Sequence, residues 1–362
     1  MPGLAVAAEL VRNEPNARMI FVGSSRALER QIFSQPDGQR FEHVILAAEP
    51  LATVRRNPWR FVWRNWRAYR EARHLLRDVR PAVVIGLGGY ASVPLVFAAQ
   101  RLGIPTLLLE QNVIPGKATR WLSRRANIVC SSFEATSSHL AHGARVVMTG
   151  NPVRAAIVDL RNTTARLPTE VQRDVRQGPL TLLVLGGSQG ASAINWAMIA
   201  AVERLRPRLT GWRIVHQAGA TDVDEINQRY AAIQVDHDVE PFFGDMAAQY
   251  QRATLVVSRA GATTLAELAC SGCPAILIPY PTAADNHQQL NADNFAAAGA
   301  ARCVVQATEP GDTAERLQRE IEFVLDDPAR LTAMRSAMFG MARPEAAQRV
   351  VGEIELLRRR KF

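Results

Sequence analysis

The stretch from Leu180 to Ala193 restricts the fold more than any other part of this chain. Six strand-forming residues, 180–185, lead directly into the glycine-rich turn 186–190, and an alanine-rich segment with helical periodicity follows. Glycines allow backbone N–H groups to approach an anion, and the start of a helix supplies roughly half a positive charge. The stretch therefore predicts a buried parallel strand, a turn and a helix. It leaves open whether the turn binds a phosphate or only joins the two elements.

A second segment, Ser258 to Leu268, has the same organisation. The strand expected at 254–257 delivers a loop containing Gly261 to a helix whose first turn offers N–H groups and hydroxyls to a phosphate. Glu267 lies nearly two turns into that helix, where its carboxylate suits ribose hydroxyls; the alternative is a solvated helix glutamate. We expect this segment and the turn 186–190 to face one ligand.

Strands and helices alternate throughout 180–340, which predicts a parallel sheet with ligands at the carboxyl ends of its strands. Residues 279–289 are expected to form a long polar loop. In that loop the amides of Gln288 and Gln289 suit hexose hydroxyls, and His287 is either a base or simply an exposed histidine.

The length of 362 residues predicts two domains. We place a first α/β domain, without the strand and loop that should open it, at 1–155 and a linker at 156–179. A second α/β domain follows at 180–340, and a C-terminal helix at 341–362 is expected to pack back on the first. The formal net charge of +9 indicates an anionic partner, either nucleic acid, acidic lipid or a phosphorylated substrate.

Four cysteines are too few for a disulfide framework in a chain of this length and indicate a reducing compartment. Cys270 and Cys273 have C-x-x-C spacing, but they fall at the end of a helix, where the dipole disfavours a thiolate. We therefore interpret them as packing residues. The uncharged stretch 81–100 is about long enough to span a bilayer, but its glycines and Pro94 interrupt it, and we expect no transmembrane helix.

The segment from Arg55 to Arg80 predicts a long helix capped by Asn57, with Pro58 at its first position. It has two apolar stripes where a surface helix needs one. The stripe expected on the sheet contains Phe61, Ala68, Ala72, Leu75, Leu76 and Val79. The opposite side contains Trp59, Val62, Trp63, Trp66, Arg70, Arg73 and Arg77. Either loops or the other domain cover the tryptophans, or this side is a monotopic membrane surface with arginines beside anionic lipid.

Residues 86–91 satisfy the pattern G-x-G-x-x-A, and Glu110 follows roughly twenty residues later, so a dinucleotide site must be considered. Two features weigh against it. The pattern lies in mid-domain and not at the first βα unit, and Glu110 is followed at once by the polar loop 111–116, which suits a sugar.

Six motifs resemble, in order, those of the MurG family, and the resemblance covers nearly the whole chain. The motifs are Gly88-Gly89-Tyr90, Glu110-Gln111-Asn112, Gly150-Asn151-Pro152-Val153-Arg154, Gly186-Gly187-Ser188-Gln189-Gly190-Ala191, Ser258-Arg259-Ala260-Gly261-Ala262 and Asp285-Asn286-His287-Gln288-Gln289. The resemblance implies an α/β GT-B fold of two Rossmann-like domains with parallel sheets and an interdomain cleft. It implies an inverting transferase that moves N-acetylglucosamine from UDP-N-acetylglucosamine to the muramoyl 4-hydroxyl of undecaprenyl-pyrophosphoryl-N-acetylmuramoyl-pentapeptide (lipid I), which gives lipid II in peptidoglycan synthesis.

The same resemblance implies roles for individual residues. Phe243 would lie against the uracil, Glu267 would hold the ribose, and Ser188 with the helix start would hold the pyrophosphate, in place of a metal. Gln288 and Gln289 would bind the sugar, with Asn112 and Arg154 completing the site from the first domain. The implied substrate-binding set is Asn112, Arg154, Ser188, Phe243, Arg259, Ala262, Thr263, Thr264, Leu265, Ala266, Glu267, Gln288 and Gln289. No cofactor and no nucleic-acid partner are implied.

The family begins with a strand and a Gly-Gly-Thr-Gly-Gly-His loop just before the helix that here starts at Pro2. We expect residues encoding that strand and loop to precede Met1. The histidine of that loop is a candidate general base in the family, so no catalytic residue is assigned here, and Glu110 and His287 are the candidates that remain.

The tryptophan–arginine helix matches the part of the family that docks on the cytoplasmic face of the cell membrane, which implies a peripheral protein beside anionic lipid. Two alternatives remain. One is a non-catalytic nucleotide-sugar-binding subunit that needs a partner, and the other is a UDP-sugar epimerase of the same fold.

Overall fold

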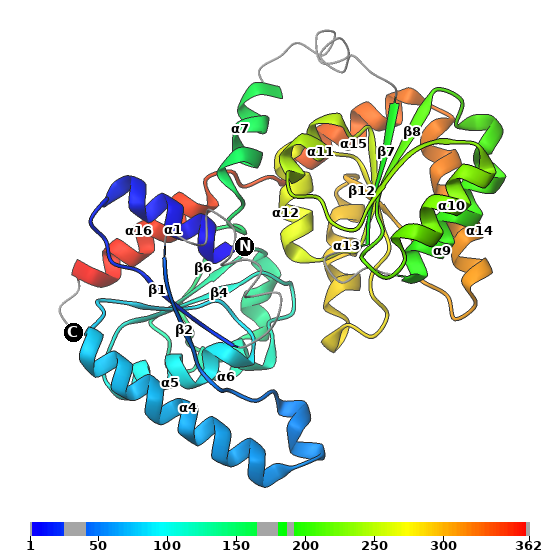
Figure 1. Cartoon of the computed structure of the whole chain (residues 1–362). Coiled ribbons are helices and arrows are strands. Elements are labelled where there is room, and N and C mark those ends of the chain that lie inside the picture. Colours follow the sequence, from blue (N-terminus) through cyan, green and yellow to red (C-terminus); the bar gives the residue numbers. More distant parts are fainter. Residues whose placement is uncertain (1, 25–40, 165–179, 187–191, 360–362) are drawn as a thin grey trace. The chain divides into compact units, whose positions relative to one another are not determined.

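The computed structural model describes residues 2–24, 41–164, 180–186 and 192–359 (Figure 1). The chain divides into two compact units. Unit 1 comprises Met1–Arg154 together with Glu345–Phe362, and unit 2 comprises Ala155–Pro344. Each unit is an α/β layer structure around its own parallel sheet, as the alternation of strands and helices predicts.

Unit 1 contains a two-stranded and a four-stranded sheet, and every strand pair is parallel. In the larger sheet the spatial order follows the sequence. The strands are β1 (Ile20–Gly23), β2 (Glu42–Ile45), β3 (Val84–Gly86), β4 (Thr106–Glu110), β5 (Ile128–Ser131) and β6 (Val146–Met148).

Helices cover both faces of the larger sheet of unit 1. Successive side chains of a strand point to opposite faces, so Leu107 and Leu109 of β4 pack beneath one helix layer and Leu108 beneath the other. The first layer consists of α1 (Pro2–Asn13) and α16 (Ala346–Arg359), the blue and red helices of Figure 1. The second consists of α4 (Pro58–Val79), α5 (Val93–Arg101) and α6 (Lys117–Leu122). The described part of unit 1 also contains three short 3-10 helices: η1 (Leu51–Arg55), η2 (Tyr90–Ser92) and η3 (Glu134–His139).

Unit 2 has one six-stranded parallel sheet in the order β12-β11-β10-β7-β8-β9. From β7 the chain continues to β8 on one side, whereas β10 continues to β11 on the other. The sheet therefore has a topological switch point between β7 and β10. The strands are β7 (Leu180–Leu185), β8 (Trp212–Gln217), β9 (Asp236–Glu240), β10 (Leu255–Ser258), β11 (Ala275–Leu277) and β12 (Ala301–Cys303).

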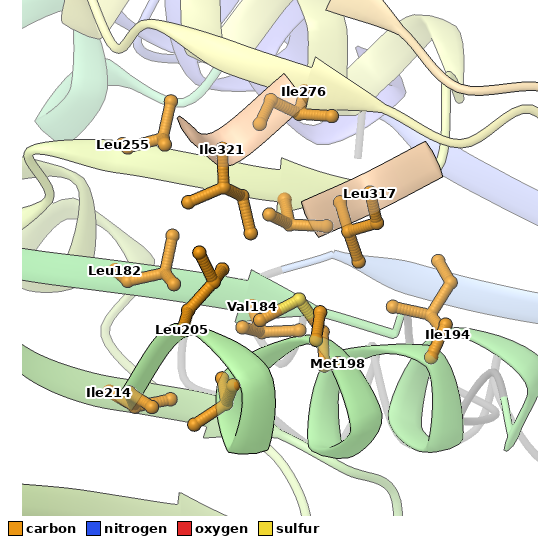
Figure 2. Packing of buried hydrophobic residues seen from close by; sticks show 14 of the residues in the cluster. Leu182, Val184, Ile194, Met198, Leu205, Ile214, Leu255, Ile276, Leu317 and Ile321 are labelled. Atoms are coloured by element: carbon orange, nitrogen blue, oxygen red, sulfur yellow. The ribbon is translucent and has the colours of Figure 1, made fainter. Parts of the chain in front are cut away.

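The main core of unit 2 lies between this sheet and one helix layer. Leu182 and Val184 of β7 belong to one buried cluster with Met198 of one helix and Leu317 of another (Figure 2). This layer consists of α9 (Ser192–Leu205), α10 (Val223–Ile233) and α14 (Pro310–Leu325). The opposite face carries α7 (Ala155–Thr164), α11 (Met246–Arg252), α12 (Ala262–Ser271) and α15 (Pro328–Met341), and α13 (His287–Ala297) lies beside β12. The unit also contains η4 (Arg206–Arg208) and η5 (Ala284–Asn286).

Two segments differ from their predicted conformation. Residues 156–164 of the predicted linker are helical and belong to α7 (Ala155–Thr164), which packs on α12 within unit 2. The rest of the predicted linker, residues 165–179, lies outside the described residues. The prediction of a loop throughout 279–289 was wrong, because α13 begins at His287. The C-terminal helix α16 packs on α1 and on strands β4 and β5, and Arg145 pairs with Glu353 at 3.2 Å.

Candidate functional site

The carboxyl ends of three neighbouring strands meet at the switch point of unit 2. Leu185 of β7 is paired with Gln217 of β8 on one side and with Ser258 of β10 on the other. In open α/β sheets ligands bind at this position, because the loops after the two central strands diverge to opposite faces and leave a crevice. The two stretches singled out in the sequence thus leave the sheet side by side. Residues 187–191, including Ser188, lie outside the described residues.

The turn after β10 exposes the start of α12. Gly261 occupies the N-cap position and brings no capping side chain, whereas the N-cap residues Asp245 of α11 and Asp327 of α15 each accept a hydrogen bond from their own first turn. Ala262 is buried, while Thr263 and Thr264 are partly exposed. The N–H groups of this first turn, with the helix dipole behind them, form an anion-binding geometry.

Further along α12 the predicted residues have different surroundings. Leu265 is fully buried and Ala266 is partly exposed, so Leu265 faces the interior of unit 2. Glu267 is only 5% exposed, and its Oε2 accepts a hydrogen bond of 3.1 Å from the hydroxyl of Tyr250 on α11. The alternative of a solvated helix glutamate was therefore wrong. A buried carboxylate with a fixed orientation is suited to binding hydroxyl groups.

Arg259 connects the ends of three strands. Its Nη1 donates to the carbonyl oxygens of Ile278 and Pro279 at 3.0 and 3.3 Å and to Oε1 of Gln306 at 2.8 Å. Its guanidinium also lies 5.3 Å from the ring centre of Tyr280. Partial burial lowers the pKa of the guanidinium, and in the described part of the chain no carboxylate forms an ion pair with it. A partly buried cation in this situation favours an anionic ligand nearby.

The start of α13 is attached to the same turn. Asn291, fully buried, donates to the carbonyl of Ala260 at 3.3 Å, and Oε1 of Gln288 accepts from the backbone N–H of Tyr280 at 3.0 Å. The structure thus brings Gln288 close to the Arg259 turn. Gln289 points elsewhere, since its Nε2 donates to Oδ1 of Asp293 at 2.7 Å and to the sulfur of Cys303 at 3.4 Å.

Phe243 lies beyond the end of β9 and is 5% exposed. Its backbone N–H donates to Oε1 of Gln217 at 3.5 Å, and the carbonyl of Gln217 accepts from Gly186 at 3.3 Å. Gln217 of β8 therefore bonds both to Phe243 and to the first residue after β7. Sequence reasoning did not find Gln217 or Tyr250, because their roles depend on which strands and helices become neighbours.

In unit 1 the loop after β4 is held by Glu110. The Glu110 carboxylate is buried. Its Oε1 accepts hydrogen bonds from the backbone N–H of Asn112 at 3.1 Å and from the Asn112 side-chain Nδ2 at 3.3 Å. Its Oε2 accepts a hydrogen bond from the backbone N–H of Gly116 at 3.1 Å. These contacts give Glu110 the role of shaping the loop that presents Asn112. Arg154, partly buried, is the last residue of the first segment of unit 1.

A second candidate surface lies on α4. The aromatic–basic face, defined as Trp59, Trp63, Trp66, Arg70, Arg73 and Arg77, is exposed, with side-chain exposures of 83%, 55% and 54% for the three tryptophans. The helix is capped as predicted, since Oδ1 of Asn57 accepts from the N–H of Arg60 at 2.9 Å. Leu51 of η1, 65% exposed, extends this face and was not predicted. Among the described residues, no helix combines the length and the apolar character that crossing a bilayer requires.

Comparison with known proteins agrees with this geometry. The model of the glycosyltransferase family 28 N-terminal domain matches residues 1–131, and that of the family 28 C-terminal domain matches residues 181–350. The chain is 36% identical to the "UDP-N-acetylglucosamine--N-acetylmuramyl-(pentapeptide) pyrophosphoryl-undecaprenol N-acetylglucosamine transferase" of Anaeromyxobacter sp. (strain Fw109-5), over 99% of this chain and 91% of that protein.

Solved structures give the same result. The crystal structure of Acinetobacter baumannii MurG has a TM-score of 0.75 at 30% identity and covers 98% of this chain and 95% of its own. A UDP-GlcNAc 2-epimerase from Neisseria meningitidis, solved with UDP-GlcNAc, has a TM-score of 0.67 at 13% identity, with 98% and 95% coverage, which shows the shared fold alone. The two parallel-sheet units are thus the Rossmann-like domains of a GT-B fold, and the chain belongs to the MurG family of N-acetylglucosaminyltransferases.

Proposed function

We propose that this chain transfers N-acetylglucosamine from UDP-N-acetylglucosamine to the 4-hydroxyl of the muramoyl group of lipid I, the reaction named for its relatives. The observation that carries the proposal is the β10–α12 turn at the switch point. There an uncapped helix start, a partly buried arginine without a carboxylate partner among the described residues and the buried Glu267 all belong to one short segment.

In this proposal the diphosphate of the donor binds at the start of α12. The N–H groups of Ala262 and Thr263 and the hydroxyl of Thr264 face it, and Arg259 supplies positive charge. Glu267, oriented by Tyr250, accepts hydrogen bonds from the ribose. Phe243 would contact the uracil and Gln288 the sugar. Gln289 would reach the sugar only after giving up its hydrogen bonds to Asp293 and Cys303. Ser188, outside the described residues, would contact the diphosphate.

The reaction is a single displacement. The 4-hydroxyl oxygen of the acceptor attacks C1 of N-acetylglucosamine, the bond from C1 to the phosphate oxygen breaks, and the configuration at C1 inverts. UDP leaves with the electron pair, and the helix dipole and first-turn hydroxyls stabilise the charge that develops on it. The hydroxyl proton passes to a base. Glu110 is poorly suited to that role, because both its oxygens already accept hydrogen bonds from its own loop.

We also propose that the aromatic–basic face of α4 rests on the cytoplasmic leaflet, where the lipid-linked acceptor is found. Tryptophan rings prefer the headgroup region, and each arginine near anionic lipid contributes about 1 kcal/mol. The exposure of three tryptophans on one helix supports this role, since exposed apolar surface of this kind marks an interaction site.

Titration calorimetry with UDP-N-acetylglucosamine tests the donor site. Micromolar binding is expected, and Glu267→Ala is expected to weaken it by about 10- to 100-fold, which corresponds to losing hydrogen bonds to a charged acceptor. Glu203→Ala, which removes an exposed carboxylate on α9, is the matched control and should bind like the wild type. Release of UDP with a lipid I analogue tests transfer itself. An absence of donor binding, or equal binding by Glu267→Ala, contradicts the proposal.

A further inference from the structure

A cavity of about 650 Å³ lies in unit 1, between α4 and α5. Five of its twelve lining residues are aromatic. Tyr69 of α4 and Phe97 of α5 face each other with ring centres 5.6 Å apart, and Phe61, Trp66 and Pro94 also line the cavity. The volume is in the usual range for small-molecule sites, which are mostly apolar with a few polar groups. We call this cavity the α4–α5 groove.

The groove adjoins a glycine turn and the aromatic–basic face. One of its lining residues, Tyr90, directly follows the turn Gly88-Gly89 at the carboxyl end of β3, where both glycines have positive φ angles of 85° and 74°. The groove shares Trp66 and Arg73 with the aromatic–basic face. Its residues on α4 extend from Phe61 to Arg73, a rise of roughly 18 Å along the helix.

The charges of the groove suit an anionic amphiphile. Glu49 lines one end, but its carboxylate is paired with Arg60 at 3.0 Å and Arg64 at 2.9 Å, and the hydrogen bond from Arg60 lowers its pKa. Two other lining arginines, Arg73 and Arg101, are exposed and give the rim a net positive charge. An apolar interior with cations at its rim is complementary to a hydrocarbon chain among phosphate headgroups.

We propose that the α4–α5 groove binds the polyprenyl chain of the lipid-linked acceptor, next to its diphosphate. The proposal rests on the proposed function and specifies which part of the acceptor this groove recognises. In this proposal the acceptor diphosphate lies at the Gly88-Gly89 turn, and the chain attached to it runs from there along the groove towards the membrane. A free phospholipid has no diphosphate-linked sugar that would need this turn. Each methylene buried against the aromatic wall is worth about a fourfold gain in affinity.

The test compares two acceptor analogues that differ only in their lipid, one with a tetraprenyl chain and one with a butyl group. In Val93→Trp the larger ring fills the groove at the first turn of α5. We expect its KM for the tetraprenyl acceptor to rise about tenfold, with the KM for the butyl acceptor and for the donor unchanged. Tyr69→Ala removes an aromatic side chain from the wall of the groove without adding bulk. This variant should also raise the KM for the tetraprenyl acceptor. Val11→Trp, on exposed α1, is the control.

The outcomes separate the two proposals. An equal rise in KM for both acceptors, or no rise for the tetraprenyl acceptor, overturns the proposal that the α4–α5 groove binds the polyprenyl chain. If the wild type transfers to neither acceptor, the proposed function fails. The groove proposal is then tested separately, by measuring direct binding of farnesyl diphosphate. Saturable binding that Val93→Trp weakens at least fivefold supports the groove. Equal binding of inorganic pyrophosphate, or binding of farnesyl diphosphate that Val93→Trp leaves unchanged, overturns it.

Discussion

The hydroxyl of Tyr250 on α11 donates a hydrogen bond of 3.1 Å to Oε2 of Glu267 on α12, and both side chains are buried. The bond fixes the direction of the carboxylate before any ligand arrives. Tyr250→Phe keeps the ring and removes only this donor. We expect the dissociation constant for UDP-N-acetylglucosamine to rise about three- to tenfold. Losing a hydrogen bond to a charged group costs about 1.5 kcal/mol of binding free energy, and it costs less where another donor partly replaces the lost one. Titration calorimetry measures it.

The double variant Tyr250→Phe/Glu267→Ala distinguishes orientation from packing. If Tyr250 acts through Glu267, the double variant binds the donor no more weakly than Glu267→Ala alone. Additive losses would mean that Tyr250 contributes to the site independently of the carboxylate.

His216 should make the stability of unit 2 depend on pH. The imidazole is fully buried, with Nδ1 2.9 Å from the hydroxyl of Tyr230 and Nε2 3.0 Å from Oδ1 of Asn195. Burial lowers the pKa of His216 to about 3. The amide nitrogen of Asn195 already donates to Ala218 and Asp222, so Oδ1 accepts from His216, and the neutral ring carries its proton on Nε2.

Since the pKa is lower in the folded state, the unfolded chain binds the proton more tightly. The free energy of unfolding contributed by His216 is therefore fully present above about pH 6.5. It falls by up to about 1.4 kcal/mol per pH unit as the pH drops towards 3. Calorimetric unfolding of His216→Gln should show a shallower pH slope in this window than the wild type. The variant of an exposed histidine, His142→Gln, should keep the wild-type slope, and equal slopes for all three proteins would refute the assignment.

The cysteines should resist alkylation in the folded protein. Burial raises the pKa of Cys130 to about 12, so at pH 8 roughly one molecule in ten thousand has the thiolate. Burial also raises the pKa of the half-buried Cys303, and Cys270 and Cys273 are buried. Mass spectrometry after iodoacetamide treatment at pH 8 should find Cys130 unmodified in the native protein and modified in urea. Rapid native labelling of Cys130 would mean that the β5 region opens.

The aromatic–basic face of α4 predicts the lipid dependence of membrane binding. We expect Trp59→Ala and Arg73→Ala each to weaken binding to phosphatidylglycerol vesicles about fivefold, since each contributes about 1 kcal/mol. High salt should reduce the effect of Arg73→Ala on vesicle binding and leave the effect of Trp59→Ala unchanged. Co-sedimentation with the vesicles measures the fraction of protein bound. Leu356→Ala, an exposed apolar residue of α16, serves as the control and should partition like the wild type.

Gly272 ends α12 with a φ of 63°, and a Cβ at this position would lie 2.3 Å from the ring of Phe339 on α15. Gly272→Ala therefore combines an unfavourable backbone conformation with a clash in packed surroundings. We expect it to lower the free energy of unfolding by about 2–4 kcal/mol, measured by thermal unfolding. Gly340→Ala in α15 meets no neighbouring atom and should instead be neutral or slightly stabilising. Similar stability of the two variants would contradict this packing.

Local patterns predicted the parallel fold and several element boundaries. The strand β7 and the capped start of α4 follow from residues within one or two turns of each other, and Asn57 caps as expected. The start of α13 was missed because its first turn is polar and follows Asp285 and Asn286, both with positive φ. That conformation is typical of a loop, and asparagine and aspartate tolerate it.

The parts of the site that could not be predicted depend on distant neighbours. The contact of Tyr250 with Glu267 requires α11 and α12 to pack together. The bonds that hold Glu110 arise from the path of the loop after β4, so the sequence left Glu110 as a candidate base and did not predict that it shapes this loop. The α4–α5 groove likewise forms between two helices whose facing residues are separated by a strand and a turn.

The placement of α16 determines the order in which the chain can fold during synthesis. Val350, Val351 and Ile354 cover one face of β4 and β5, yet they leave the ribosome after all of unit 2. Unit 2 is a continuous segment and is able to form its core while α1 alone covers that face of unit 1. Until α16 has been synthesised, we therefore expect nascent unit 1 to expose apolar surface of β4 and β5 that is buried in the finished fold.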